Sequence, residues 1–354
     1  MDKMVEILPF YKDKRVLITG HTGFKGSWLC KILTLAGSKV TGYALKPPTQ
    51  PNLFDLCDYH DRLDSTIGDI RDAKALHECF VKAKPDIVFH LAAQPLVRDS
   101  YERPVYTYET NVMGTVNILE EVRKSDYVKS VVNVTTDKVY LNNEWVWGYR
   151  ETEPLDGYDP YSNSKSCSEL VTHSYKKSYF DPAGLSVSTA RAGNVIGGGD
   201  YAANRIIPDC IRAAISGEEI IVRNPHSTRP YQHVLESLGG YLLIAMRQYT
   251  DFDISGYYNV GPDDGDCVST GYLADVFCAS WGEGQAWKNV SEGNIHEANF
   301  LKLDCSKIKY VLGWQPKWDI RNAVEKTVEW AKGCRDGHNI NDIMIRQINE
   351  YFND

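Results

Sequence analysis

The chain lacks an excess of basic residues. Its 39 lysines and arginines are outnumbered by 47 aspartates and glutamates, and the formal net charge is −8 at pH 7. Because binding to a nucleic-acid backbone or to an anionic membrane requires a basic face, this balance argues against both kinds of partner. An anionic small molecule remains compatible with the charge, since a few local arginine and lysine side chains suffice to hold one.

Paired cysteines and long apolar runs are also missing. The nine cysteines are scattered, contain no CxxC and are odd in number, which indicates neither a zinc site nor a disulfide framework. No apolar stretch approaches the ~20 residues of a membrane span, and the opening MDKMVEILPFYKDK lacks the unbroken apolar core of a signal peptide. We therefore expect a cytoplasmic protein with reduced thiols, no metal site and no membrane segment.

Short apolar runs alternate with segments of helical spacing through the first half of the chain. Strands are predicted at RVLITG, KVTGYAL, STIGDI (ending at Asp69), PDIVFHLAA, SVVNVTT and LSVSTARAGNVI, with helices between them. Repeated β-α units predict a parallel sheet with right-handed crossovers, and so a Rossmann-type, doubly wound α/β fold. Beyond about Gly197, loops containing glycine and proline separate shorter elements. We expect a dinucleotide-binding domain over residues 1–190, to which residues 234–260 return, and a smaller substrate-binding lobe over residues 191–233 and 261–354.

The loop GHTGFKG, residues 20–26, joins the first predicted strand to a helix. Gly20 permits a sharp turn, Gly23 lets backbone N–H groups approach a pyrophosphate, and Gly26 allows the helix to pack closely on the strand. This context favours a dinucleotide site over a simple packing turn. His21 and Lys25 are bulky for such a loop; beside the pyrophosphate they would add a cation or crowd the backbone, so we expect looser cofactor binding. No acidic residue ends the second strand, which leaves the choice between NAD and NADP open at that position.

The segment DPYSNSKS places a tyrosine and a lysine four residues apart. On a helix Tyr161 and Lys165 share one face, and a nearby ammonium favours the phenolate of a tyrosine whose free pKa is ~10. Thr135 and Thr136 end the strand of NVTTDKVY, where open α/β sheets bind ligands. An ordinary amphipathic helix explains the Tyr-Lys pair alone, but the pair, the threonines and the glycine loop together favour a catalytic site.

The motifs GHTGFKG, GDI, HLAAQP, NVMGT, TTDKVY, YSNSK and ARAGNVIGGGD, in this order and spacing, resemble the extended short-chain dehydrogenase/reductase family of nucleotide-sugar enzymes. YNVGP and LDCSKIKYVLGWQPKW extend the resemblance over nearly the whole chain. The resemblance implies bound NAD, a nucleotide-sugar substrate, and a homodimer or dimer of dimers formed through the long helices that contain Asn111 and Lys165.

Within that family the residues after the catalytic threonine separate the chemistries. Sugar 4-epimerases have small or apolar residues there and 4,6-dehydratases have Asp-Glu, whereas here Thr136 is followed by Asp137 and Lys138. This pair most resembles the 4,6-dehydratase branch that acts on CDP-glucose in deoxysugar and O-antigen biosynthesis, a branch of hydro-lyases. A 4-epimerase or reductase, or a catalytically silent NAD-binding protein, remains the alternative. Asp137 counts against a 4-epimerase or reductase. The intact set of Thr136, Tyr161 and Lys165 counts against a catalytically silent protein.

The resemblance also implies a role for each catalytic residue. Tyr161 takes the proton of the sugar 4-hydroxyl, Thr136 holds that oxygen, Lys165 binds the cofactor ribose, and Asp137 protonates the departing 6-hydroxyl. Lys138 replaces the glutamate expected as the base at C5. It is either a base with a depressed pKa or a cation that steadies the enolate, and a solvated surface lysine is the third possibility.

The matched motifs extend the expected sites beyond the catalytic residues. We expect no metal ligand. The expected cofactor-binding residues are Gly20, His21, Gly23, Phe24, Lys25, Gly26, Asp69, Ile70, Leu91, Ala92, Ala93, Gln94, Asn111, Thr135, Tyr161 and Lys165. The expected substrate-binding residues are Arg98, Tyr101, Asn194, Arg205, Arg229 and His296, in which guanidinium groups suit a diphosphate.

Overall fold

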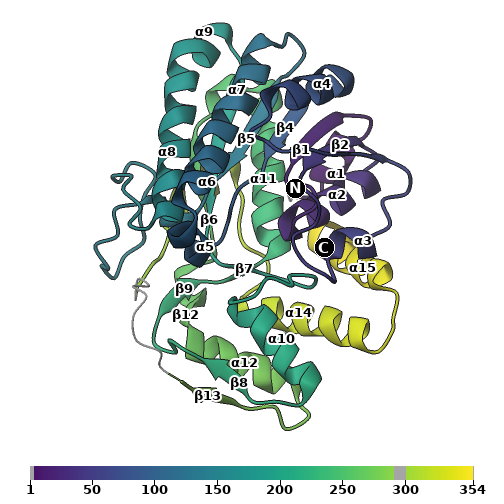
Figure 1. Cartoon of the computed structure of the whole chain (residues 1–354), viewed down its shortest axis with the longest axis vertical. Coiled ribbons are helices and arrows are strands. Elements are labelled where there is room, and N and C mark those ends of the chain that lie inside the picture. The colour runs from purple at the N-terminus through teal and green to yellow at the C-terminus, as the bar shows by residue number, and fades with distance from the viewer. Residues whose placement is uncertain (1–3, 291–299, 354) are drawn as a thin grey trace.

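The computed structural model describes residues 4–290 and 300–353 and has a central sheet with helices on both faces and a smaller lobe beneath it (Figure 1). The sheet has seven strands in the order β11-β6-β5-β4-β1-β2-β3, and every neighbouring pair is parallel. This confirms the predicted doubly wound α/β fold. The strands are β1 Arg15–Thr19, β2 Lys39–Ala44, β3 Leu63–Ile67, β4 Ile87–His90, β5 Ser130–Val134, β6 Ser186–Ala192 and β11 Tyr257–Val260.

Alternate residues of the inner strands enter two different hydrophobic clusters. Val16 and Ile18 of β1 pack with α1, α2, α11 and α15 on one face, whereas Leu17 packs with α4, α7 and α8 on the other. Both faces of the sheet are therefore buried, which explains the near-continuous apolar runs in the sequence. The helices are α1 Ile7–Tyr11, α2 Phe24–Leu35, α4 Ala73–Ala83, α7 Gly114–Lys124, α8 Pro160–Tyr175, α11 Val234–Thr250 and α15 Ile340–Asn353.

Two helical segments contain a π-helical turn that the sequence pattern did not indicate. The helix expected around TYETNVMGTVNILEEVRKS consists of α6 Pro104–Tyr108, a π-helical turn Glu109–Met113 and α7. A second such turn, Lys176–Phe180, joins α8 to α9 Asp181–Ala183. Single π-turns often lie near functional sites. The first one holds Asn111, whose position is described below.

The smaller lobe is built from two-stranded sheets and helices. β7 Val195–Ile196 pairs with β10 Gln232–His233, β9 Thr228–Pro230 with β12 Cys267–Ser269, and β8 Ile220–Val222 with β13 Trp287–Asn289. The α-helices of the described chain that have not yet been named, in either part of the molecule, are α3 Leu53–Leu56, α5 Val97–Glu102, α10 Ile206–Ser216, α12 Thr270–Trp281, α13 Ser306–Leu312 and α14 Ile320–Arg335. The 3₁₀ turns are Asp137–Val139, Phe252–Ile254 and Asp264–Asp266.

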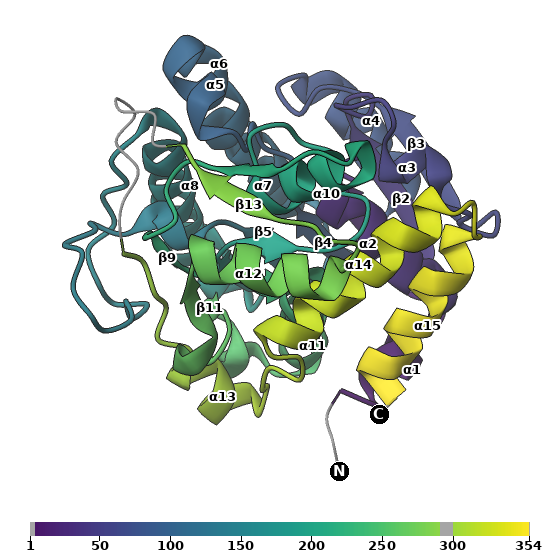
Figure 2. The same cartoon turned by 90° about the horizontal axis from the view of Figure 1, so that it is seen from below.

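Two late segments pack on the central sheet. β11 pairs with β6, and α11 crosses the same face as α2. The C-terminal α15 lies beside α1 (Figure 2), and Lys31 of α2 donates a hydrogen bond to Asn341 of α15 at 3.1 Å. The division into two domains, with residues 261–354 in the smaller lobe, stays a prediction. Within the described ranges, no helix has the length and apolar character needed to cross a bilayer.

Candidate active site

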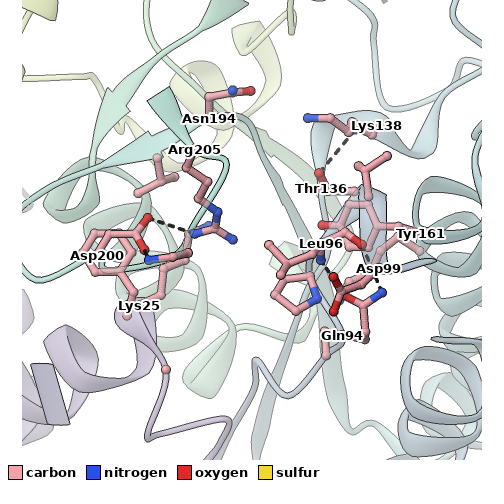
Figure 3. Close-up of a pocket in the computed structure, with 18 of the residues that line it drawn as sticks. Lys25, Gln94, Leu96, Asp99, Thr136, Lys138, Tyr161, Asn194, Asp200 and Arg205 are labelled. Atoms are coloured by element: carbon pink, nitrogen blue, oxygen red, sulfur yellow. Dashed lines mark hydrogen bonds and ion pairs between the residues drawn. The ribbon is translucent and has the colours of Figure 1, made fainter. Parts of the chain in front are cut away.

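A cavity of about 1940 Å³ lies between the carboxyl ends of the parallel strands and the smaller lobe (Figure 3). Its wall includes the residues that follow β1, β2, β3, β4, β5 and β6, together with residues of α10, β8 and β9. Open α/β sheets bind ligands at this edge. The cavity exceeds the 300–1,000 Å³ typical of one small-molecule site, so it has room for two ligands.

The loop between β1 and α2 forms a close-packed cradle at one end of this cavity. Gly20 has φ +78°, and a Cβ there would lie 2.8 Å from the backbone N of Ala92. A Cβ on Gly26 would lie 2.2 Å from the carbonyl O of Gly20, so a side chain is excluded there too. Gly23 precedes α2 as its N-cap. The N-terminus of α2 thus faces the cavity with backbone N–H groups, an arrangement that fits a pyrophosphate.

His21 points away from this cradle. Its side chain is fully buried, its Nε2 lies 2.7 Å from Ser65 Oγ, and its ring lies edge-on to Phe54. A Cβ on Gly42 of β2 would lie 2.3 Å from the ring, so this glycine makes room for it. Burial lowers the pKa of His21 to about 4, which keeps the ring neutral at pH 7. The expectation that the His21 ring crowds the pyrophosphate or adds a cation is therefore wrong. The glycine in KVTGYAL, Gly42, was the one sequence feature that could have indicated room for the ring beneath β2.

Lys25, in the first turn of α2, extends towards the substrate side. Its Nζ donates to Tyr241 Oη at 3.2 Å, and it lies beside Asp200 and Arg205 in Figure 3. Burial lowers the pKa of Lys25 to about 7, and the positive charge of Arg205 adds to this effect. The side chain therefore titrates near neutral pH in the cavity wall. Phe24 also lines the cavity.

The residues expected around an adenosine follow β3 in the cavity wall. Asp69 and Ile70 line the cavity, and Arg71 Nη2 donates to Asp69 Oδ2 at 2.7 Å. The Asp69 pKa is lowered by its hydrogen bond with Arg71. Lys46 follows β2 and lines the wall there. Leu91, Ala92, Ala93 and Gln94, which follow β4, line the middle of the cavity.

Asn111 stands behind the cavity wall and does not line it in the described chain. Its Oδ1 accepts from Gln94 N at 2.8 Å, and its Nδ2 donates to Gln94 O at 3.1 Å and to Ser164 Oγ at 2.8 Å. The side chain is 1% exposed. The structure therefore does not place Asn111 in contact with the cavity space, and its bonds orient the backbone of Gln94, which does line it.

The residues that follow β5 meet α8 at the centre of the cavity. Thr135, Thr136, Asp137, Lys138, Tyr161 and Lys165 all line the wall, and Figure 3 shows Thr136 beside Tyr161. Asp159 caps α8 by accepting from Ser162 N at 2.9 Å, which fixes where the helix begins. Lys165 Nζ donates to Val134 O at 3.1 Å. The strand end and the first two turns of α8 thus bring the predicted catalytic residues together.

The pKa of Tyr161 moves in the direction opposite to the expected one. Burial raises it to about 12, and a hydrogen bond with Thr136 offsets only part of that effect. Burial also lowers the pKa of Lys165 to about 8, against the negative charge of Glu169. The tyrosine thus needs additional positive charge in the cavity before it becomes a phenolate near pH 7.

Asp137 presents two unlike carboxylate oxygens. Oδ1 accepts from Thr136 Oγ1 at 2.9 Å and lies 3.7 Å from Lys138 Nζ, whereas Oδ2 is buried without a hydrogen-bond partner among the described residues. A Cβ on Gly193 would lie 3.0 Å from Oδ2, so the backbone comes close to this oxygen. The Lys138 side chain is 32% exposed. A substrate hydroxyl is a suitable partner for Oδ2.

The predicted substrate-binding residues divide into three groups. Arg98, Asn194, Arg205 and Arg229 line the cavity. Tyr101 is 47% exposed and is absent from the wall formed by residues 4–290 and 300–353, so the structure does not place it at the site. His296 lies outside the described residues.

Sequence reasoning missed two residues that bind the cations of the cavity wall, Arg205 and Lys25. Arg205 Nη1 lies 2.9 Å from Asp200 Oδ2, and Tyr241 of α11 accepts the hydrogen bond of Lys25. The acid in GGGD, five residues before Arg205, was a weak signal for the first. Tyr241 lies more than 200 residues from Lys25, and no local pattern connects them. No group of His, Cys, Asp or Glu able to hold a metal ion occurs in the part of the chain that the structure covers.

Comparison with known proteins gives strong matches over almost the whole chain. The family model described as GDP-mannose 4,6 dehydratase matches residues 17–327. The chain is 49% identical over 349 residues to the CDP-glucose 4,6-dehydratase of Salmonella typhimurium, and the alignment covers 97% of each protein. It is 26% identical to the dTDP-glucose 4,6-dehydratase of Shigella flexneri, over 89% of this chain and 92% of that protein.

Solved structures share the fold at lower identity. A dTDP-glucose 4,6-dehydratase from Bacillus anthracis, in complex with NAD, superimposes with a TM-score of 0.76 at 22% identity, covering 91% of this chain and 98% of that chain. A UDP-glucose 4-epimerase from Thermotoga maritima, with UDP-glucose, gives a TM-score of 0.79 at 23% identity, covering 90% and 99%.

Proposed function

This chain belongs to the GDP-mannose 4,6 dehydratase family, and we propose that it is an NAD-dependent CDP-glucose 4,6-dehydratase. It is a hydro-lyase that converts CDP-glucose into CDP-4-keto-6-deoxyglucose and water. The observation that carries this function is the 49% identity to the Salmonella enzyme over 97% of both chains, which spans both walls of the cavity. The Thr136-Asp137-Lys138 sequence at the end of β5 supports it, because a 4-epimerase needs no acid at C6.

The residues of the cradle fit NAD. The space that Gly20 and Gly26 keep free of side chains, together with the N-terminus of α2, would hold the pyrophosphate, and Asp69 and Ile70 would contact the adenine. Lys165 would bind the nicotinamide ribose. When bound, NAD supplies the hydride acceptor for C4 and a positive charge beside the catalytic tyrosine. That charge is of the sign that Tyr161 requires.

Oxidation at C4 requires a base and a hydrogen-bond partner for the same hydroxyl. Tyr161, as the phenolate, accepts the 4-hydroxyl proton, and Thr136 donates to the oxygen as it becomes a ketone. Lys165, on the same face of α8 as Tyr161, stabilises the phenolate while it is cationic. The 4-ketone acidifies the C5 proton and so prepares the elimination.

Elimination of water requires an acid at C6. Asp137 donates a proton from Oδ2, the oxygen that has no hydrogen-bond partner among the described residues, to the departing 6-hydroxyl. We assign Lys138 the second of its two open roles: its Nζ lies 3.7 Å from Asp137 Oδ1 at the reaction centre, and as a cation it steadies the enolate formed at C5. Transfer of the C5 proton to another group forms this enolate, and loss of the 6-hydroxyl with the Asp137 proton releases water. Hydride return from bound NADH to C6, and return of a proton to C5, would complete the product.

Parallel incubations test the function. We expect the protein with NAD to convert CDP-glucose, and to convert dTDP-glucose and GDP-mannose at least about tenfold more slowly. The readout is the ultraviolet absorbance that 4-keto sugars develop in alkali. Tyr161→Phe is the matched inactive control, since it removes one hydroxyl. No turnover of CDP-glucose, or formation of a 4-epimer in place of the keto sugar, contradicts the proposal.

Solvent-deuterium exchange at C5 of the bound 4-keto sugar tests the role of Lys138. If Lys138 is a cation, Lys138→Arg retains most of the exchange and Lys138→Ala slows it by about 10²-fold at most, since general-base catalysis contributes about 10²–10⁴. Loss of exchange in both variants identifies Lys138 as the base instead.

The assembly and the compartment are proposed on independent features. Val105 of α6, Met113 of the first π-turn and Leu170 of α8 are 70%, 50% and 54% exposed, and these elements pack side by side. We propose that they form the core of a homodimer, or of a dimer of dimers. Light scattering after gel filtration measures the mass of the assembly.

The nine cysteines are free thiols, which supports a cytoplasmic location. The keto sugar suits later steps of deoxysugar and O-antigen synthesis.

A further inference from the structure

A buried ion pair lies directly behind the catalytic centre. Glu169 of α8 and Arg191 of β6 are 1% and 2% exposed, and Arg191 Nη2 lies 2.8 Å from Glu169 Oε2. Neither residue lines the cavity within the described ranges. A buried pair of this kind adds little net stability compared with apolar residues of the same volume, because both charges lose their hydration. Its effect is therefore sought in the neighbouring groups that it binds.

Glu169 binds the strand end on which the catalytic threonine stands. Its Oε1 accepts a short hydrogen bond from Thr135 Oγ1, and its Oε2 accepts from Thr189 Oγ1 at 2.7 Å. Thr135 immediately precedes Thr136, and Thr135 N donates to Ala190 O at 2.9 Å. The carboxylate thus joins β5, β6 and α8 at the point where β5 ends.

Arg191 anchors this carboxylate to a second layer of buried groups. Its Nη1 donates to Tyr140 Oη at 2.9 Å and to Glu151 O at 3.1 Å. Tyr140 Oη in turn donates to Asn259 Oδ1 at 2.6 Å. With its own partners fixed, the guanidinium holds Glu169 in one position, and Glu169 has little freedom to move away from α8 or Thr135.

Glu169 also shares a helix face with the catalytic lysine. Tyr161, Lys165 and Glu169 are spaced four residues apart on α8, so they lie one above another. The titratable groups that face Lys165 are Tyr161 and Glu169 on its own helix, Lys25 on α2 and His90 on β4; burial keeps His90 neutral by lowering its pKa to about 3. Glu169 is the one whose negative charge favours the ammonium of Lys165.

We propose that Glu169 is a positioning residue for the dehydratase reaction: clamped by Arg191, it fixes Thr135 beside the catalytic Thr136 and supplies the negative charge that Lys165 faces. The inference rests on the proposed function, because it concerns the roles of Thr136 and Lys165 in that reaction. It assigns to the buried pair an effect on proton chemistry in the cavity, which a purely structural pair would not have.

The pH profile of Glu169→Gln tests this role. In the wild type, kcat/KM for CDP-glucose falls at high pH as Lys165 loses its proton. Without the Glu169 charge the pKa of Lys165 falls further, so we expect this alkaline limb to move to lower pH by about one unit. The KM for CDP-glucose should change by less than about threefold, since Glu169 lies outside the cavity wall.

Two further variants complete the experiment. Glu236→Gln removes another buried glutamate, on α11, which accepts from Trp318 N at 2.7 Å and from Tyr351 Oη at 2.9 Å, and it should leave the limb in place. Glu169→Gln combined with Arg191→Met avoids an unpaired buried cation and should shift the limb in the same direction as Glu169→Gln. If Glu169→Gln fails to fold, the double variant decides alone.

The outcomes separate this inference from the proposed function. A wild type that converts CDP-glucose, with an alkaline limb identical in Glu169→Gln and the double variant, overturns the inference and leaves the function intact. An equal shift in Glu236→Gln also overturns it. A wild type without turnover refutes the function and this inference together.

Discussion

Lys25 provides the sharpest test of the electrostatics of the cavity. Burial holds its pKa at about 7, well below the 10.5 of a free lysine, and its neighbours include the cations Arg205 and Lys165. The folded chain thus disfavours a charged lysine at this position. Lys25→Met keeps the length of the side chain and removes the charge, so we expect the variant without NAD to be more stable than the wild type at low pH.

The magnitude follows from the two pKa values. One pKa unit corresponds to ~1.4 kcal/mol, so a lysine held at about 7 loses at most about 5 kcal/mol. Because the Lys25 side chain is only half-buried, solvent screening reduces this loss to about 3 kcal/mol. The sign comes from proton linkage. Below pH 7 Lys25 is charged in both states and the full penalty applies. Between pH 7 and 10.5 the unfolded chain binds more protons than the folded one, so the wild type gains stability as pH rises.

Urea unfolding of both proteins without NAD at pH 6, 7.5 and 9 measures the difference. We expect Lys25→Met to exceed the wild type by about 3 kcal/mol at pH 6, with the gap narrowing steadily by pH 9. Lys46→Met, which removes an exposed lysine from the same cavity, is the control and should give a small, pH-independent difference. A gap that is constant with pH, or a Lys25→Met variant less stable than the wild type at pH 6, refutes the reasoning.

Four further predictions concern the catalytic centre and the cradle. Tyr161→Phe should lower kcat by about 10²–10⁴-fold with NAD binding retained in calorimetry. Asp137→Asn should slow water elimination by about 10²-fold or more while C4 oxidation, followed by transient NADH absorbance, continues. Gly26→Ala should destabilise the protein by more than about 3 kcal/mol in urea unfolding because a Cβ meets Gly20 O at 2.2 Å, whereas Gly23→Ala, with 3.4 Å to that atom, should stay within about 1 kcal/mol. His21→Gly should lower stability by about 2–4 kcal/mol by emptying the space beneath Gly42, and an unchanged midpoint would contradict the buried position of the ring.

The fold was largely predictable because its signals are local. Apolar runs of strand length, separated by segments of helical spacing, predicted six parallel strands, and all six occur. The boundaries were less accurate: the strand expected to end at Asp69 ends at Ile67. The sequence pattern did not predict the π-turn at Glu109–Met113, which is a single turn within a longer helical segment.

The candidate site was predictable where its residues stand in one short segment. Tyr161 and Lys165 are four residues apart on α8, and Thr136, Asp137 and Lys138 follow one strand, so both sets line the cavity. Prediction failed where the sequence left open whether a side chain points into the cavity or into the protein interior. His21 and Lys25 belong to the same sequence motif, yet the His21 ring enters the space under Gly42, whereas the Lys25 side chain, in the first turn of α2, reaches Tyr241.

Local spacing therefore determined the strands, the phosphate cradle and the pairing of tyrosine with lysine, because covalent geometry sets which neighbours in a segment share a face. Tertiary packing decided the rest. It brought Glu169 and Arg191 together from separate elements, and it raised the pKa of Tyr161 while lowering those of Lys25 and Lys165. Burial and the distances between charges depend on how the whole chain packs, and the spacing of residues within a segment does not encode them.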